Sequence, residues 1–319
     1  TTPEEAQCFR DRREPVAAVG SGRGTIRGAT PKLDLARCCG DFARMELPQI
    51  NLPPADRWVC DNGLVVIHRE THAAPLVSVH VWFRSGSIHE GPWLGSGLSH
   101  FLEHMLFKGT DRRGPLQISR EVHGAGGSMN AYTTYDRTVY HIDGPAESAP
   151  VFFDVLADMG LRPRLPKDEF ARERDVILRE IAMDDDDPDR RLFRDFVGTA
   201  FRRHPYRFPV IGHRELFEGL TSDDLQAYWE SRYAPANAVV VVVGAVTPEH
   251  VRDLIETHFG TAPMRRVAEA PVAAEPPQLA VRQSRQSGDV NVTRGLNGYK
   301  IPGLAAPDGP ALEVLAHIL

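Results

Sequence analysis

Two histidines and a glutamate stand close together in the segment GLSHFLEHMLFKG, which begins at Gly97. A helical period of 100° per residue places His100, Glu103 and His104 on the face opposite the apolar side chains of the segment. Residues four apart on a helix have Cβ atoms about 5–6 Å apart, so two imidazoles can share one zinc ion while the glutamate takes a proton from a water. A solvated face that happens to carry two histidines is the alternative, and three fixed positions alone do not decide between them.

A catalytic zinc usually has three protein ligands, so one more donor is expected elsewhere in the chain. In KDEFARERDVILREIAMD, Glu169, Glu173 and Glu180 fall within about 40° of one helical face. A carboxylate stripe on a long helix is usually solvated surface. Ile177 and Ile181 share this arc, however, which indicates that the face points inward and that its carboxylates need a partner.

Two other clusters could bind metal but are better explained otherwise. Cys38, Cys39 and Cys60 could form a zinc site, but they lack a C-x-x-C pair, so free thiols are expected. The four aspartates at 184–187 could bind calcium, but a polar loop whose last aspartate caps the next helix is favoured.

Composition limits the classes of partner. A formal net charge of −6 disfavours nucleic acid and anionic membranes as main partners. No apolar run reaches the roughly 18 residues of a membrane span, and no signal-peptide pattern is present. We therefore expect a cytoplasmic protein, with export as an alternative if the natural N-terminus differs from this one. Residues 1–44 are expected to be disordered or a misassigned upstream extension, with translation starting at Met45.

Strand and helix signals alternate from Trp58 onward. Asp-Asn-Gly between two short apolar runs predicts a β-hairpin, and LVSVHVWF and SMNAYTTYDRTVYHI predict further strands. The run AVVVVVGAV predicts a strand that is buried on both faces. Helices are expected over 146–160 and 167–183, in SDDLQAYWESRY, and after Thr247 and Pro248, which suit an N-cap and first helical position.

Composition also divides the chain. We predict a main domain over residues 45–263 and a linker rich in alanine, proline and glutamate over 264–278. A new strand and the helix pattern ALEVLAHIL are expected within 279–319, as the start of an incomplete second domain.

The inverted motif H-x-x-E-H, together with the segments around it, resembles the pitrilysin/insulinase family of zinc metallopeptidases. The resemblance is greatest to the branch that contains mitochondrial processing peptidase and bacterial relatives. It extends through GGSMNAYTTYDRTVYH, ERDVILREI, DDDDPDRRLF, HPYRFPVIGH and YAPANAVVVVVGAV, in the order found in the family. It implies an α+β fold, with a mixed, mainly antiparallel sheet and helices packed on one side, as the first of two similar halves.

The resemblance also implies roles for individual residues. His100, His104 and Glu180 would bind one zinc ion per chain, and Glu103 would be the general base. Glu173 matches a second acidic position that supports the site. Asn130 and Ala131 match an edge strand along which a substrate peptide adds as an extra strand.

The implied activity is zinc-dependent endopeptidase cleavage of unfolded or presequence-like peptides. In the family, the second half contributes an arginine and a tyrosine near the scissile bond, and neither can be assigned in this chain. We therefore expect a homodimer or a heterodimer with a related subunit, or a longer chain. Noncatalytic alternatives are a structural subunit, a peptide-binding module and a zinc-storage site. The intact H-x-x-E-H motif and Glu180 disfavour the first of these.

Overall fold

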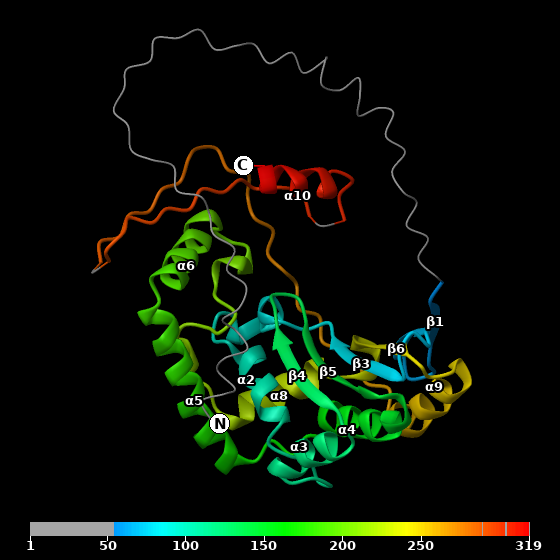
Figure 1. Cartoon of the computed structure of the whole chain (residues 1–319). Helices are drawn as coiled ribbons and strands as arrows, with labels where there is room; N and C mark the ends of the chain where they lie inside the picture. Colours follow the sequence, from blue (N-terminus) through cyan, green and yellow to red (C-terminus); the bar gives the residue numbers. More distant parts are fainter. Residues whose placement is uncertain (1–53, 289, 304, 319) are drawn as a thin grey trace, which may run out of the picture. The chain divides into compact units, whose positions relative to one another are not determined.

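The computed structural model describes residues 54–288, 290–303 and 305–318. Its centre is a six-stranded sheet with the strand order β1-β2-β6-β3-β5-β4 (Figure 1). The strands are β1 (Asp56–Val59), β2 (Val65–Glu70), β3 (Leu76–Phe83), β4 (Ser128–Thr133), β5 (Thr138–Pro145) and β6 (Ala238–Gly244). Only the β2–β6 pair is parallel, and the other four pairs are antiparallel. The expected mixed, mainly antiparallel sheet is confirmed.

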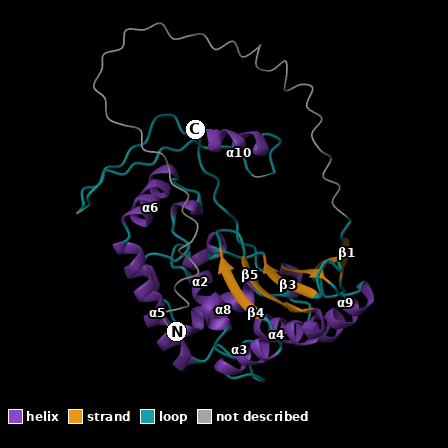
Figure 2. Ribbon diagram, in the orientation of Figure 1, coloured by secondary structure: helices purple, strands orange, loops and turns teal. Residues whose placement is uncertain are grey.

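The α-helices follow the strands in the order expected for an α+β domain. They are α2 (Leu98–Leu106), α3 (Pro115–Gly124), α4 (Ala149–Leu161), α5 (Lys167–Asp186), α6 (Pro188–Ala200), α7 (Arg214–Glu218), α8 (Ser222–Arg232), α9 (Pro248–Ile255) and α10 (Gly309–Ile318). Helices α2 and α4 pack against β3, β4 and β5 on one side of the sheet (Figure 2). Among the described residues, no helix is both long enough and apolar enough to cross a membrane.

One face of the sheet forms the hydrophobic core. Along β3, alternate side chains are buried, and Val79, Val81 and Phe83 are at most 1% exposed. They contact α2 and α4, whose apolar residues include Phe101, Leu102 and Phe152, all fully buried. Burial at every second residue of a strand, facing helices whose apolar residues recur about every 3.6 positions, is the pattern of a sheet with one covered face.

Three predictions about individual elements need correction. Strand β6 is buried on one face only, and Val243 on its other face is 39% exposed, because helices cover just one side of the sheet. The predicted strand after the linker is not found among the described residues of 279–303, although helix α10 is. Asp184 to Asp186 belong to helix α5 and not to a loop.

Other local predictions are confirmed. The last of the four aspartates, Asp187, caps α6 by accepting hydrogen bonds from the N–H groups of Asp189 and Arg190. Thr247 caps α9, and Pro248 is its first residue. Cys60 is a free cysteine. The other cysteines, the N-terminal segment 1–44 and Met45 lie outside the described residues, and the proposed domain boundaries stay predictions.

Candidate metal centre

The start of helix α2 lies against the backbone of the loop around Ile211. Gly97 has a φ of +76°, which favours glycine, and an added Cβ there would overlap the carbonyl oxygen of Ile211. The N–H of Ser99 in the first turn donates to Oε1 of buried Glu90 at 2.9 Å. These two contacts hold the start of the helix next to Glu90 and the loop around Ile211, and they thereby fix the position of His100.

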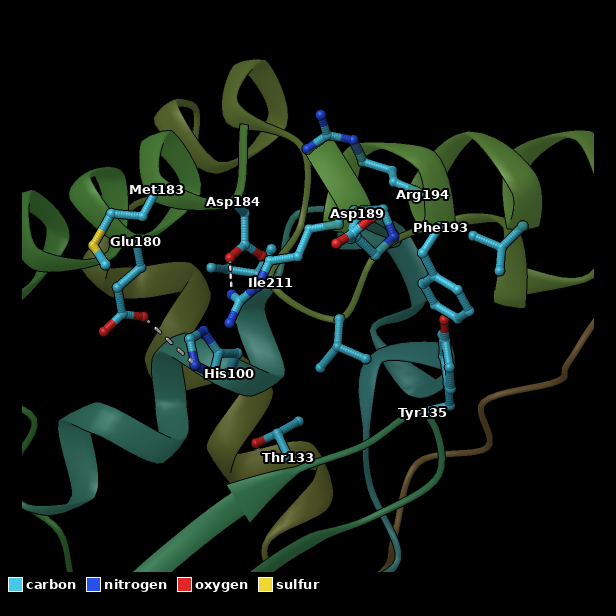
Figure 3. A pocket seen from close by; sticks show the side chains of 14 residues that line it. His100, Thr133, Tyr135, Glu180, Met183, Asp184, Asp189, Phe193, Arg194 and Ile211 are labelled. Carbon is cyan, nitrogen blue, oxygen red and sulfur yellow. Dashed lines mark hydrogen bonds and ion pairs between the residues drawn. The ribbon is translucent and has the colours of Figure 1, made fainter. Parts of the chain in front are cut away.

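Side chains from α2 and α5 converge on one point. Nε2 of His100 and Nε2 of His104 each lie 3.9 Å from Oε2 of Glu180. The two imidazole rings are 4.7 Å apart at an angle of 70°. Figure 3 shows His100 and Glu180 pointing toward one another from their two helices. The structure thus brings together the three residues expected to bind zinc, and their donor atoms lie within 4.8 Å of one another.

This donor set suits a zinc ion. At 3.9 Å the carboxylate is too far from either imidazole for a hydrogen bond, yet close enough for all three groups to share one ion. Burial lowers the pKa of His100 to about 3, with a further contribution from neighbouring His104, so its imidazole is neutral as a metal ligand must be. Its buried Nδ1 has no hydrogen-bond partner within the described part of the chain. The ring's Nε2 is the nitrogen that faces Glu180.

Glu173 orients the second histidine. Its Oε1 lies 2.8 Å from Nδ1 of His104, and its Oε2 lies 2.5 Å from Nζ of Lys108. Burial by itself raises the pKa of Glu173, but these two partners outweigh it, so the net shift is downward. Burial likewise lowers the pKa of His104, but the hydrogen bond to Glu173 and the charge of Glu180 outweigh it and raise that pKa. The carboxylate fixes the ring so that Nε2 faces Glu180.

Glu103 lies on the same face of α2, with only 8% of the residue exposed. Its Oε2 accepts a hydrogen bond of 2.6 Å from the hydroxyl of Thr133 in β4. Burial raises the pKa of the Glu103 carboxyl, and the hydrogen bond from Thr133 opposes that shift. A partly desolvated carboxylate with one oxygen held and the other unconstrained is suited to accept and return a proton.

A cavity of about 720 Å³ opens beside these groups. His100, Thr133 and Glu180 form the side nearest the metal site (Figure 3). The remaining wall is largely apolar and comes mainly from α5, α6 and the loop after the short 3₁₀ helix η4 (Pro205–Arg207). It includes Met183, Phe193, Val197, Pro209 and Ile211. A side chain next to a bound peptide bond would have an apolar surface to contact there.

Asn130 and Ala131 lie in β4, the last strand of the sheet. One side of β4 pairs with β5, and its other side has no strand partner among the described residues. The side chain of Asn130 is exposed and shares a sheet face with His141 of β5, whereas Ala131 packs against the core. The two residues therefore offer the backbone of a sheet edge that is unpaired within the described residues.

Three supporting residues were not found from the sequence. Thr133, Lys108 and Glu90 contact Glu103, Glu173 and Ser99, respectively. Only Lys108 carried a local signal, because it follows His104 by four positions and therefore lies near it on the helix face. Glu90 lies nine residues before Ser99, whereas Thr133 contacts Glu103 from a strand 30 residues further along the chain.

Comparisons with known proteins agree with this geometry. The family described as Insulinase (Peptidase family M16) matches residues 65–214, and the domain described as Peptidase M16 inactive domain matches residues 219–319. An uncharacterized zinc protease of Mycobacterium leprae is 34% identical over 261 residues, which cover 81% of this chain and 58% of that protein. A probable mitochondrial-processing peptidase subunit beta of Arabidopsis thaliana is 30% identical over 260 residues, which cover 81% and 49%.

Solved structures give the same result. A protease from Helicobacter pylori aligns with a TM-score of 0.69 and 30% identity, over 72% of this chain and 56% of the other. The chain belongs to the M16 (insulinase) family of peptidases. It spans about half the length of the curated relatives that it matches. The second family domain starts at residue 219, so it includes β6, which lies inside the sheet.

Proposed function

We propose that this chain provides the zinc-binding half of a metalloendopeptidase that cleaves unfolded peptides. The observation that carries the proposal is the convergence of His100, His104 and Glu180 beside Glu103. A zinc held by these three residues would supply Lewis-acid activation of a water and of the scissile carbonyl. One ion per chain at this site is proposed with it, and the zinc protease relatives support the choice of metal.

Three residues of the chain would then have separate roles in catalysis. Glu103 takes the proton of the attacking water on a carboxylate oxygen and later returns it to the leaving amine. Thr133 keeps the other oxygen of Glu103 in place. Glu173 holds the His104 ring in the orientation that directs Nε2 to the metal.

The substrate is proposed to bind as an added strand on β4. Its backbone would pair with the free edge at Asn130 and Ala131, which requires an extended, unfolded segment. Thr133 ends this strand and contacts Glu103, so a peptide along the edge would pass the metal site. The adjacent apolar cavity would accept a side chain of the same peptide.

Completion by a second half, in the same polypeptide or in a related subunit, is part of the proposal. Two observations support this part of the proposal. The chain covers only part of the length of its relatives. One relative, a cytochrome b-c1 complex subunit 1 of Rattus norvegicus, is by name part of a complex.

Two isosteric variants test the catalytic assignment. Glu103→Gln keeps size and polarity but cannot accept a proton, so the variant should retain zinc while peptide hydrolysis falls by at least about 10²-fold. Glu180→Gln should instead reduce the zinc content, because an amide is a poor replacement for a carboxylate ligand. Undiminished hydrolysis by Glu103→Gln would remove the general base from the proposal, and full zinc retention by Glu180→Gln would remove the third ligand.

A further inference from the structure

A second group of polar side chains lies on the face of the sheet that the helices leave open. Three neighbouring strands, β3, β5 and β4, contribute two residues each. In the strand register, one row is His80, His141 and Asn130, and the next is Ser78, Asp143 and Ser128. All six belong to the face opposite the one that packs against α2 and α4.

The rest of that face has a different character. Strand β6 presents Val239, Val241 and Val243 there, and β2 presents Val65, Ile67 and Arg69 in register with them. The two histidines of this face lie side by side on β3 and β5, next to serine, asparagine and aspartate.

Within this group, His80, His141 and Asp143 have metal-ligand chemistry. One donor atom from each lies within 4.8 Å of the other two. Nδ1 of His141 is 3.2 Å from Oδ2 of Asp143, and Nε2 of His80 is 3.0 Å from Oγ of Ser78. The register of β3 and β5 places His80 opposite His141, so the backbone fixes the positions from which the two side chains start.

We propose that His80, His141 and Asp143 form a second binding site for a divalent transition metal of the zinc class. Two imidazoles and one carboxylate are a donor set that zinc, nickel and copper accept, with water completing the coordination. The rings lie stacked, with centroids 4.8 Å apart and planes at 24°, so each must turn about its χ2 angle to direct a nitrogen at a shared ion. Both histidines are half-buried, and Asp143 is exposed.

This site is separate from the metal centre on α2. Thr133, which contacts Glu103, lies three positions from Asn130 along β4, and successive residues of a strand point to opposite faces. Glu103 therefore faces the helix side of the sheet, and His80 and His141 face the other side. Substitutions can therefore remove the ligands of one site and leave those of the other unchanged.

Zinc titration of the full chain by calorimetry tests the proposal. In the variant His100→Ala/His104→Ala, the first site is disabled, and one zinc per chain should still bind. Adding His80→Asn and His141→Asn should weaken that binding by more than about 100-fold, the upper end of what loss of an outer-sphere partner costs. His72→Asn is the matched control, because His72 also pairs with a carboxylate, Glu70, at 2.7 Å but lacks a second histidine, and it should change nothing.

A second measurement does not depend on folding of the variants. Imidazole ¹⁵N resonances of the chain with an intact sheet face should shift for His80 and His141 as zinc is added beyond the first equivalent, while those of His72 stay in place. Failure of the His100→Ala/His104→Ala chain to bind zinc would overturn the proposal. Equal affinity with and without His80 and His141, or unchanged resonances of these two rings, would also overturn it.

Discussion

Oε1 of Glu173 lies 2.8 Å from Nδ1 of His104, on the side of the ring away from Glu180. The same carboxylate is also paired with Lys108, and it is nearly buried. A buried carboxylate in this position fixes both the tautomer and the orientation of a metal-binding histidine.

Replacing Glu173 by glutamine should therefore weaken zinc binding without removing a ligand. The expected loss of affinity is about 10–100-fold, the range for outer-sphere partners of metal ligands. Competition with a chromophoric chelator measures it. Glu169→Gln is the control, because Glu169 is on the same helix but pairs with Arg172, and it should bind zinc normally. Equal affinity in the two variants would reduce Glu173 to a structural residue.

Asp154→Asn should destabilise the fold in a pH-dependent way. Burial alone would raise the pKa of Asp154, but hydrogen bonds from Arg112 and Arg113 lower it from 3.8 to about 2. A depressed carboxyl pKa stabilises the folded state above the unfolded pKa, and this stabilisation is lost as the pH falls toward 2. The variant should be less stable by about 2 kcal/mol near neutral pH.

Urea denaturation of the zinc-free chain checks this expectation, since zinc loss at low pH would obscure it. The difference in free energy of unfolding between wild type and Asp154→Asn, the stability gap, should be smaller at pH 3 than at pH 6. Asp168→Asn, whose side chain is 70% exposed, should show no comparable gap. A gap that stays constant over this range would rule out the ion pairs as its cause.

Peptide binding along β4 predicts that the effect of N-methylation alternates from one substrate position to the next. Residues of an added strand direct their N–H groups alternately toward and away from the edge at Asn130 and Ala131. N-methylation of a substrate at alternate positions should each cost about 0.5–1.5 kcal/mol of binding, and the positions between them much less. Dissociation constants of the N-methylated peptides, measured on the Glu103→Gln chain so that the peptides are not cleaved, provide the measurement. A loss that is uniform along the peptide would contradict strand addition.

The metal ligands in the described part of the chain are partly exposed to solvent. The side chains of His100, His104 and Glu180 are 19%, 21% and 37% exposed. Fixed donors stabilise a developing oxyanion best where water is excluded, and one such donor contributes about 10²–10³-fold in kcat. We therefore expect residues 1–319 alone to cleave a quenched fluorescent peptide slowly, with stimulation of at least about 10²-fold by the other half or by a related subunit. Fast, chelator-sensitive cleavage without that addition would contradict this expectation.

The sequence predicted most reliably what depends on local periodicity. The face of α2 with His100, Glu103 and His104 follows from one helical period, and the inward direction of Glu173 follows from Ile177 and Ile181, which are buried as expected. The hairpin at Asp-Asn-Gly and the caps at Asp187 and Thr247 depend on neighbouring residues in the same way.

Contacts between distant segments could not be predicted in this way. The contact of Thr133 with Glu103 requires that β4 lies beside α2, and no pattern in either segment specifies this. The run of valines in β6 has no visible alternation because all its residues are apolar, so its half-open environment could not be inferred. Asp184 to Asp186 have side chains typical of loops, but ion pairs with Arg190 and Arg194 accompany the longer helix.

The position of β6 also determines when the sheet can form during synthesis. Strand β6 lies between β2 and β3, although β2 and β3 follow one another closely in the sequence. A nascent chain that has emerged only as far as α8 contains every zinc ligand but leaves a gap in the middle of its sheet. Closing that gap requires a late, long-range insertion, which costs loop entropy before any contact is gained and makes folding slow. Until β6 has been made, the unpaired edges of β2 and β3 are exposed to other chains, so this interval carries the greatest risk of misassembly.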